Sequence, residues 1–443
     1  MSAYHFIGIG GAGMSVIAEL LHARGAYITG SDMHESPTLD RLRNLGLTIY
    51  VGHRGDQVPE NATVVYSTAV PSTNPELVIA KRRDQEVIHR SLALALAASG
   101  MDFVAVAGAH GKTTTSAMLA AALVEAGSNP SYAIGGNVLG LGTGARLGSG
   151  DVFIAEADES DGSFRNYTPR VAIVTNVESD HLDFYGTEAA FAAAFMDFAR
   201  TIVPDGLLIC CADDSGAAHL ATQAAASGIR TLTYGTDPRA DAVLDGDNLH
   251  FGKLNVRLSL QVAGAHNRLN AAAAFLAGTE LGIPATLMAR SLGAYQGAGR
   301  RFQPRGTADR VRVIDDYAHH PTEVAATLAT ARTQVGSGRV IVLFQPHLFS
   351  RTRNFADRFA HALSAADDVV VCDIFPAREA PIAGVSSRLI TDQLPGAHYV
   401  GDLEKAAART AHLARPGDLV ITMGAGSVTT AAPMILTALK ERE

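Results

Sequence analysis

Short apolar runs alternate with amphipathic, Ala- and Leu-rich segments from the start of the chain. Apolar runs at 4–10, 26–32 and 47–52 are separated by amphipathic segments at 12–25 and 36–46. The apolar runs have the length and composition of buried strands, and the segments between them have apolar residues on one face of a helix. Together they predict the order strand, helix, strand, helix, strand. This order is typical of a parallel sheet with crossover helices, so we expect an α/β fold.

The same rhythm restarts twice along the chain. A new apolar run begins at 101–108, and another begins at 311–318 after a Gly- and Arg-rich stretch. A chain of 443 residues has room for about three domains of ordinary size. We place the boundaries near residues 97 and 298, which predicts domains 1–97, 98–298 and 299–443.

Composition narrows the classes of function. The net charge is −8, with 36 Lys and Arg against 44 acids, which gives no general attraction for nucleic acid or anionic lipid. Three cysteines without CxxC spacing argue against a disulfide framework or structural zinc. The N-terminus enters a strand pattern at once, and no apolar stretch approaches the ~18 residues of a membrane span. We expect a cytoplasmic protein without membrane insertion and without nucleic acid as partner.

A glycine-rich loop joins the first predicted strand to the first predicted helix. Asp32 ends the next strand, 22 residues after Gly10. Backbone N–H groups and a helix N-terminus at such a loop suit a pyrophosphate, with the acid placed for a ribose hydroxyl. The motif alone leaves three alternatives open: NAD(P), another diphosphate such as a UDP-sugar, or glycines that only allow the helix to pack tightly on the sheet. The loop consists of Gly8, Gly10, Gly11, Ala12, Gly13 and Met14 with Ile9.

A second loop between a predicted strand and helix has the character of a P-loop. Lys112 and Thr113 stand where such a loop meets terminal phosphates and Mg²⁺. The general motif has a glycine five residues before Gly111, where this chain has Val106, so the loop is shorter. A plain helix N-terminus is the alternative, but the preceding strand favours ATP binding. The residues concerned are Gly108, Ala109, His110, Gly111, Lys112, Thr113 and Thr114.

Acids and a histidine come after two strands of the middle block. Glu156 and Asp158 end one strand, and Asp180 and His181 come after another. Carboxylates beside a phosphate-binding loop suit Mg²⁺, which keeps several waters and takes one or two carboxylates. From spacing alone, His181 is equally well a metal ligand or a histidine that hydrogen-bonds within its loop.

Further polar residues gather in the later part of the chain. Asn267 and Asn270 lie one helical turn apart, and helix capping is the alternative explanation for an asparagine at this place. Three polar clusters stand near predicted strand ends of the last block, where ligands of open α/β sheets bind. They are Arg300 and Arg301; Asp315, Asp316, His319 and His320; and His347, Arg351 and Arg353.

The ordered motifs resemble a known family over essentially the whole chain. They are GIGGAGM, GAHGKTTT, EADESDGSF, NVESDHLDFYG, HNRLNA, GRRF, DDYAHHPTE, FQPHLFSRTR and DIFPAREAP. This set resembles the Mur ligases of bacterial cell-wall synthesis, most closely those that join L-alanine to UDP-N-acetylmuramate. The resemblance implies a Rossmann-like first domain for the UDP-sugar and a central P-loop ATPase-type domain. It also implies a Rossmann-like C-terminal domain that closes on ATP and binds the amino acid.

The resemblance also implies roles for individual residues. Thr113 and Glu156 would hold one Mg²⁺ and His181 a second. Mn²⁺ could replace Mg²⁺. ATP would lie on residues 108–114, with further contacts from Asn267, Asn270, Arg301 and Asp316. The UDP-sugar and amino acid would be bound by the first loop, Asp32, Ser67, Thr68, Tyr317, His319, His347, Arg351 and Arg353. The catalytic set is Lys112, Glu156, His181, Arg301 and His319.

The resemblance implies an activity in peptidoglycan precursor synthesis. The lactyl carboxylate of UDP-N-acetylmuramate would be phosphorylated by ATP, and L-alanine would then displace phosphate, in a monomer or weak homodimer. Several members of the family carry a carbamylated lysine after the metal-binding histidine, but this chain has no lysine between His181 and Arg200. The competing hypotheses are a recycling ligase for an intact peptide, an NAD-dependent oxidoreductase, and a nucleotide-gated scaffold.

Overall fold

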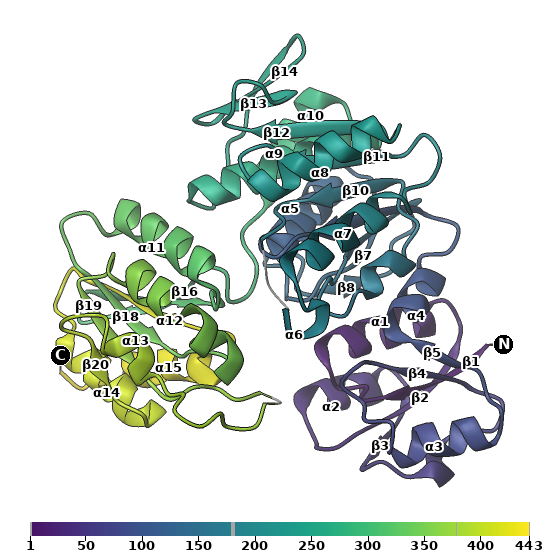
Figure 1. Ribbon diagram of the computed structural model, residues 1–443, viewed down its shortest axis with the longest axis horizontal. Helices are drawn as coiled ribbons and strands as arrows, with labels where there is room; N and C mark the ends of the chain where they lie inside the picture. The colour runs from purple at the N-terminus through teal and green to yellow at the C-terminus, as the bar shows by residue number, and fades with distance from the viewer. Residues whose placement is uncertain (1, 179–181, 378, 443) are drawn as a thin grey trace. The chain divides into compact units, whose positions relative to one another are not determined.

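The computed structural model describes residues 2–178, 182–377 and 379–442. It contains three separate sheets of five, ten and six strands, each crossed by helices. The chain forms two compact units, one of residues 1–261 with 268–296 and one of residues 262–267 with 297–443. The first two sheets belong to the first unit and the third sheet to the second (Figure 1). The predicted α/β class is confirmed, and the boundaries near 97 and 298 stay a prediction.

The first sheet is entirely parallel, with strand order β3-β2-β1-β4-β5. Its first strand and helix fall where the apolar periodicity predicts them. The strands are β1 (Ala3–Ile7), β2 (Tyr27–Asp32), β3 (Thr48–Val51), β4 (Thr63–Tyr66) and β5 (Val87–His89). The helices are α1 (Ala12–Ala23), α2 (Pro37–Asn44), α3 (Pro75–Arg82) and α4 (Arg90–Ala97).

The second sheet has the order β15-β14-β13-β12-β11-β10-β6-β9-β7-β8. Its centre is parallel, strands β13 to β15 form antiparallel pairs at one edge, and β8 is antiparallel to β7 at the other. Its central strands are β6 (Asp102–Ala107), β7 (Ser131–Ala133), β9 (Val152–Glu156), β10 (Val171–Val174), β11 (Leu207–Cys211) and β12 (Thr231–Gly235). The outer strands are β8 (Ala145–Arg146), β13 (Ala242–Asp245), β14 (Asn248–Phe251) and β15 (Leu254–Arg257). The helices are α5 (Lys112–Glu125), α6 (Leu182–Tyr185), α7 (Glu188–Ala199), α8 (Ser215–Ala226), α9 (Ala265–Glu280) and α10 (Ala285–Ser291).

The third sheet has the order β16-β17-β21-β18-β19-β20, with only β16 antiparallel to its neighbour among the described strands. Its strands are β16 (Gln303–Ala308), β17 (Val311–Asp316), β18 (Val340–Phe344), β19 (Asp368–Val371), β20 (His398–Tyr399) and β21 (Leu419–Met423). Its helices are α11 (Pro321–Val335), α12 (Phe349–Leu363), α13 (Arg388–Thr391), α14 (Leu403–Leu413) and α15 (Ala431–Lys440).

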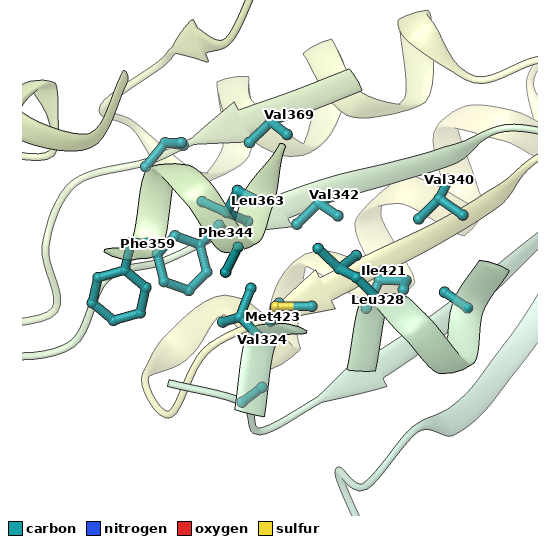
Figure 2. Packing of buried hydrophobic residues seen from close by; sticks show 14 of the residues in the cluster. Val324, Leu328, Val340, Val342, Phe344, Phe359, Leu363, Val369, Ile421 and Met423 are labelled. Carbon is teal, nitrogen blue, oxygen red and sulfur yellow. The ribbon is translucent and has the colours of Figure 1, made fainter. Parts of the chain in front are cut away.

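Strand β18 shows why the third sheet needs helices on both faces. Val342 and Phe344 turn toward the cluster formed by α11 and α12, which includes Leu328 and Phe359 (Figure 2). The alternate residues of the same strand belong to a second buried cluster with α14 and α15. Because successive side chains point to opposite faces, an uninterrupted apolar run requires cover on both sides. This is the doubly wound arrangement that places loops at the carboxyl ends of the strands.

Within the described parts of the chain, no helix is both long enough and apolar enough to cross a bilayer.

Gly30 in β2 is fixed by close packing in the first sheet. A Cβ placed there would lie 2.6 Å from Ile9 Cδ1 and 2.8 Å from the Phe6 carbonyl oxygen. We expect Gly30→Ala to destabilise the fold by about 1 to 3 kcal/mol, because backbone must move to admit the methyl group. The urea-unfolding midpoint measures this. The exposed Val51→Ala on the neighbouring strand is the control, and equal midpoints for the two variants would contradict the packing argument.

Candidate active site

The loop between β6 and α5 is shaped by two glycines with positive φ. Gly108 has φ +126° and Gly111 has φ +85°, conformations that side chains rarely adopt. A Cβ on Gly108 would lie 2.2 Å from Thr175 Oγ1, directly after β10. The loop therefore folds tightly against the end of the neighbouring strand. It leads into the N-terminus of α5, whose backbone N–H groups suit phosphate oxygens.

Lys112 is held by a buried carboxylate that sequence reasoning missed. Its Nζ lies 2.9 and 2.8 Å from the two carboxylate oxygens of Glu159, and it donates to the Gly108 carbonyl oxygen at 2.6 Å. The side chains of Lys112 and Glu159 are 17% and 2% exposed. Burial lowers the pKa of Lys112, but the charges of Glu159 and Asp158 outweigh burial and raise it. Lys112 is therefore an ammonium ion at neutral pH.

Thr113 and Glu156 are brought together as the sequence predicts. Thr113 Oγ1 donates to Glu156 Oε2 at 3.1 Å, and the Gly135 N–H donates to the other carboxylate oxygen at 2.7 Å. A hydroxyl and a carboxylate at the end of a P-loop fit a hard divalent cation. Asp180 and His181, the other predicted residues of this region, lie outside the described residues.

The two asparagines of α9 differ in their surroundings. A Cβ on Gly111 would lie 2.9 Å from Asn270 Oδ1, so the Asn270 side chain lies against the P-loop. Asn267 is the third residue of α9, and its amide donates to the Ala263 carbonyl oxygen at 2.6 Å. An N-cap accepts from backbone N–H groups instead. Helix capping therefore does not explain Asn267.

The first glycine-rich loop lies at the carboxyl end of β1. Gly10 N–H donates to Asp32 Oδ2 at 2.8 Å, and Met33 N–H donates to Asp32 Oδ1 at the same distance. Ser67 and Thr68 come directly after β4, which neighbours β1 on the other side from β2. These predicted residues therefore share one edge of the sheet. Met14 is different, because its side chain is buried in the core.

In the second compact unit, an aromatic and basic cluster surrounds Tyr317. The guanidinium groups of Arg300 and Arg301 lie 4.9 and 5.0 Å from its ring centroid, within cation–π range. The His319 ring packs edge-on against Tyr317 at 5.1 Å and against His347 at 5.9 Å. Predicted residues from three separate motifs of the last block therefore meet in one place.

Two further predicted residues belong to the same end of this sheet. Asp316 ends β17 and accepts hydrogen bonds from the N–H groups of Phe302 at 2.7 Å and Ala318 at 2.8 Å. Burial raises the pKa of Asp316 despite these bonds. Arg351 on α12 is buried and lies 3.3 Å from His347 Nδ1, whereas Arg353 is exposed and donates to Asn354.

His319 is held as a neutral imidazole. Its Nδ1 lies 3.0 Å from the Tyr317 carbonyl oxygen and 3.2 Å from Glu323 Oε2, so this nitrogen carries the hydrogen. Burial lowers the pKa of His319 to about 3, although Glu323 acts in the opposite direction. Glu323, which also lies 3.7 Å from Arg301, is a second residue that sequence reasoning missed.

The fold and the β6–α5 loop define an α/β protein of the P-loop type. Comparison with family profiles then gives three matches in chain order. Residues 3–101 match "Mur ligase family, catalytic domain", residues 106–278 match "Mur ligase middle domain", and residues 300–426 match "Mur ligase, glutamate ligase domain".

Similarity to known proteins extends over nearly the full chain. The UDP-N-acetylmuramate–L-alanine ligase of Renibacterium salmoninarum is 51% identical, covering 98% of this chain and 95% of that protein. The same-named protein of Paenarthrobacter aurescens is 50% identical, covering 98% and 96%. The crystal structure of UDP-N-acetylmuramate-alanine ligase from Thermotoga maritima matches with a TM-score of 0.81, 27% identity and complete coverage of both chains. The chain belongs to the Mur ligase family, which confirms the resemblance.

The buried Lys112–Glu159 pair gives a prediction for stability. We expect Lys112→Met to lower the free energy of unfolding by about 3 to 5 kcal/mol, because it removes the cation that compensates the buried Glu159 carboxylate. The double variant Lys112→Met with Glu159→Met should recover most of this loss, and urea unfolding measures both. The half-exposed pair Arg230–Glu280 is the control, and its disruption should cost less than about 1 kcal/mol. Additive losses at Lys112 and Glu159 would contradict the pairing.

The lowered pKa of His319 gives a prediction for pH. Below its ordinary pKa of 6.5, the unfolded chain binds a proton that the folded chain excludes down to about pH 3. The free energy of unfolding should therefore decrease as the pH is lowered. The decrease should be larger in the wild type than in His319→Asn, a variant that keeps an amide donor in place of Nδ1–H. We expect the difference between the two proteins to shrink by about 1 to 2 kcal/mol between pH 7 and pH 5 in urea unfolding. Parallel pH profiles would show that His319 titrates normally.

Proposed function

We propose that this chain is an ATP-dependent ligase that joins L-alanine to the lactyl carboxylate of UDP-N-acetylmuramate in peptidoglycan precursor synthesis. The observation that carries the proposal is about 50% identity over 98% of the chain to proteins named for this reaction. The P-loop arrangement of Lys112, Thr113 and Glu156 supports the ATP-dependent step. We also propose a cytoplasmic location, a monomer or weak homodimer, and domains 1–97, 98–298 and 299–443.

In the first step, the sugar carboxylate attacks the γ-phosphorus of ATP, ADP leaves, and an acyl phosphate forms. The obstacle is repulsion between two anions, worth several kcal/mol at an effective dielectric of about 20. Lys112, charged and positioned by Glu159, would neutralise the phosphoryl oxygens, and Arg301 would assist. Backbone N–H groups at the start of α5 would hold the β- and γ-phosphates. Asn267, Asn270 and Asp316 would contact the rest of the nucleotide.

A divalent cation is expected beside the phosphates. We propose two Mg²⁺ ions, replaceable by Mn²⁺, the first held by Thr113 and Glu156 and the second by His181. Such ions would neutralise charge on the phosphoryl oxygens.

In the second step, the L-alanine amine attacks the acyl carbon and phosphate leaves. The amine must lose a proton, and we propose His181 or His319 as the acceptor. The Nδ1–H of His319 is engaged, so only its Nε2 could accept a proton. A pKa of about 3 makes His319 a weak base unless the substrate raises it. Tyr317, His347, Arg351 and Arg353 are proposed for the amino acid, whose carboxylate suits a planar guanidinium.

The deciding experiment is phosphate release from ATP and Mg²⁺. UDP-N-acetylmuramate would be supplied with L-alanine, glycine, L-serine or the cell-wall tripeptide, and each component would be omitted in turn. We expect release that requires both the sugar nucleotide and L-alanine, with some leakage to glycine and L-serine because one methyl group is worth only about 1 to 3 kcal/mol. Preference for the tripeptide would indicate the recycling ligase, and release without the sugar would refute the proposal.

One variant separates the ATP-dependent step from binding of the sugar nucleotide. Lys112→Ala should abolish phosphate release, while its Kd for UDP-N-acetylmuramate stays within about twofold of the wild type, because the sugar nucleotide is assigned to the first sheet. Equal loss of both properties would contradict this division.

A further inference from the structure

A polar bridge joins the first and second sheets within the first compact unit. Arg90 Nη2 lies 2.6 Å from Asp158 Oδ2, and His89 Nε2 lies 3.5 Å from Asp161 Oδ2. The Thr68 hydroxyl donates to Asp161 at 3.3 Å. The residues of the first sheet stand at strand ends or at the start of α4, whereas both acids come after β9 in the second sheet. The bridge thus connects the carboxyl edges where both glycine loops lie.

Arg90 lies beside the first glycine loop. A Cβ added to Gly13, in the first turn of α1, would have Arg90 Nη1 as its nearest neighbour at 3.4 Å. The N-cap of this helix is Gly11, which has no side chain to cap it. A guanidinium over a helix N-terminus adds a full charge and directed donors to a place that already favours anions. Arg90 therefore stands where a diphosphate on this loop would meet it.

Asp158 is fixed independently of Arg90. Its Oδ1 accepts a hydrogen bond from the Ser160 N–H at 3.0 Å, which ties the carboxylate to its own turn. The same turn carries Glu159, the partner of Lys112. The Arg90 side chain is 22% exposed and that of Asp158 is 37% exposed, so the pair is partly buried but still accessible to a ligand. An arginine side chain loses rotamer entropy when it binds an anion. Because Asp158 already orders Arg90, less of this entropy is lost when the anion binds.

We propose that Asp158 is a positioning residue for the sugar nucleotide: by binding Arg90, it holds the guanidinium over the first turn of α1 to receive the diphosphate. The inference rests on the proposed function, since it assumes that the first loop binds a nucleoside diphosphate sugar. It makes an acid of the ATP-binding sheet contribute to affinity for the other substrate. Asp158 would act entirely through Arg90.

The test is a double-mutant cycle on the Kd of UDP-N-acetylmuramate, measured by calorimetry on the full chain without ATP. Asp158→Asn removes the charge but keeps the shape, and Arg90→Ala removes the group that meets the diphosphate. We expect each single variant to raise the Kd roughly tenfold, as for loss of a hydrogen bond to a charged group. Asp158→Asn should change the Kd less than about twofold in the Arg90→Ala background, because neighbours that act as a unit are non-additive.

Controls separate positioning from general destabilisation. The ion pair Arg170–Asp102 joins two strand starts of the second sheet, and Arg170→Ala and Asp102→Asn should leave the Kd within about twofold. If Arg90→Ala proves unstable in a thermal melt, Arg90→Lys replaces it in the cycle. Equal effects of Asp158→Asn with and without Arg90, or no effect at all, would overturn the inference. Absence of any binding by the wild type would instead refute the proposed function.

Discussion

The structure depends on keeping an ammonium charge in place inside a site built for anions. Lys112 is largely enclosed, with 17% of its side chain exposed, and removing its charge from water would be costly without a partner. Glu159 supplies the partner, and the Gly108 carbonyl oxygen takes a further donor position. The P-loop therefore holds its cation ready beside α5 before a polyphosphate arrives, so less reorganisation is needed at the moment of reaction.

That arrangement explains the acidic sequence after β9. Glu156, Asp158 and Glu159 lie within four residues, and three like charges so close together repel one another. Each has a different cationic or hydrogen-bonding partner: Thr113 for Glu156, Arg90 for Asp158, and Lys112 for Glu159. Burial raises the pKa of Asp158, yet the charges of Arg90 and Lys112 hold it well below its usual range. The first turn of α5 supplies the partners of Glu156 and Glu159, and the start of α4 supplies the partner of Asp158.

Sequence reasoning predicted the location of residues that directly follow a strand in the chain. The P-loop and Glu156 come after apolar strands, and parallel strands bring their carboxyl ends to one edge. It missed Glu159 and Arg90, because the partner of a buried charge depends on side-chain direction. Arg353 is a different case, because residues two apart on a helix do not share a face. Arg351 points inward from α12 and Arg353 points to solvent, a difference that the helical period of residues 349–363 could have indicated.

The first glycine loop shows how an acid of a binding motif can also shape the loop itself. In a dinucleotide site, the acid at the end of the second strand binds a ribose hydroxyl. Here one oxygen of Asp32 accepts from Gly10 N–H, and the other accepts from Met33 N–H. A Cβ on Gly10 would lie 2.9 Å from the same carboxylate, so the glycine exists to let Asp32 approach. Asp32 thus serves to shape the loop. The loop retains its helix N-terminus for a diphosphate, and each oxygen of Asp32 keeps a second lone pair for a ribose hydroxyl, so this acid alone does not decide between NAD and another diphosphate.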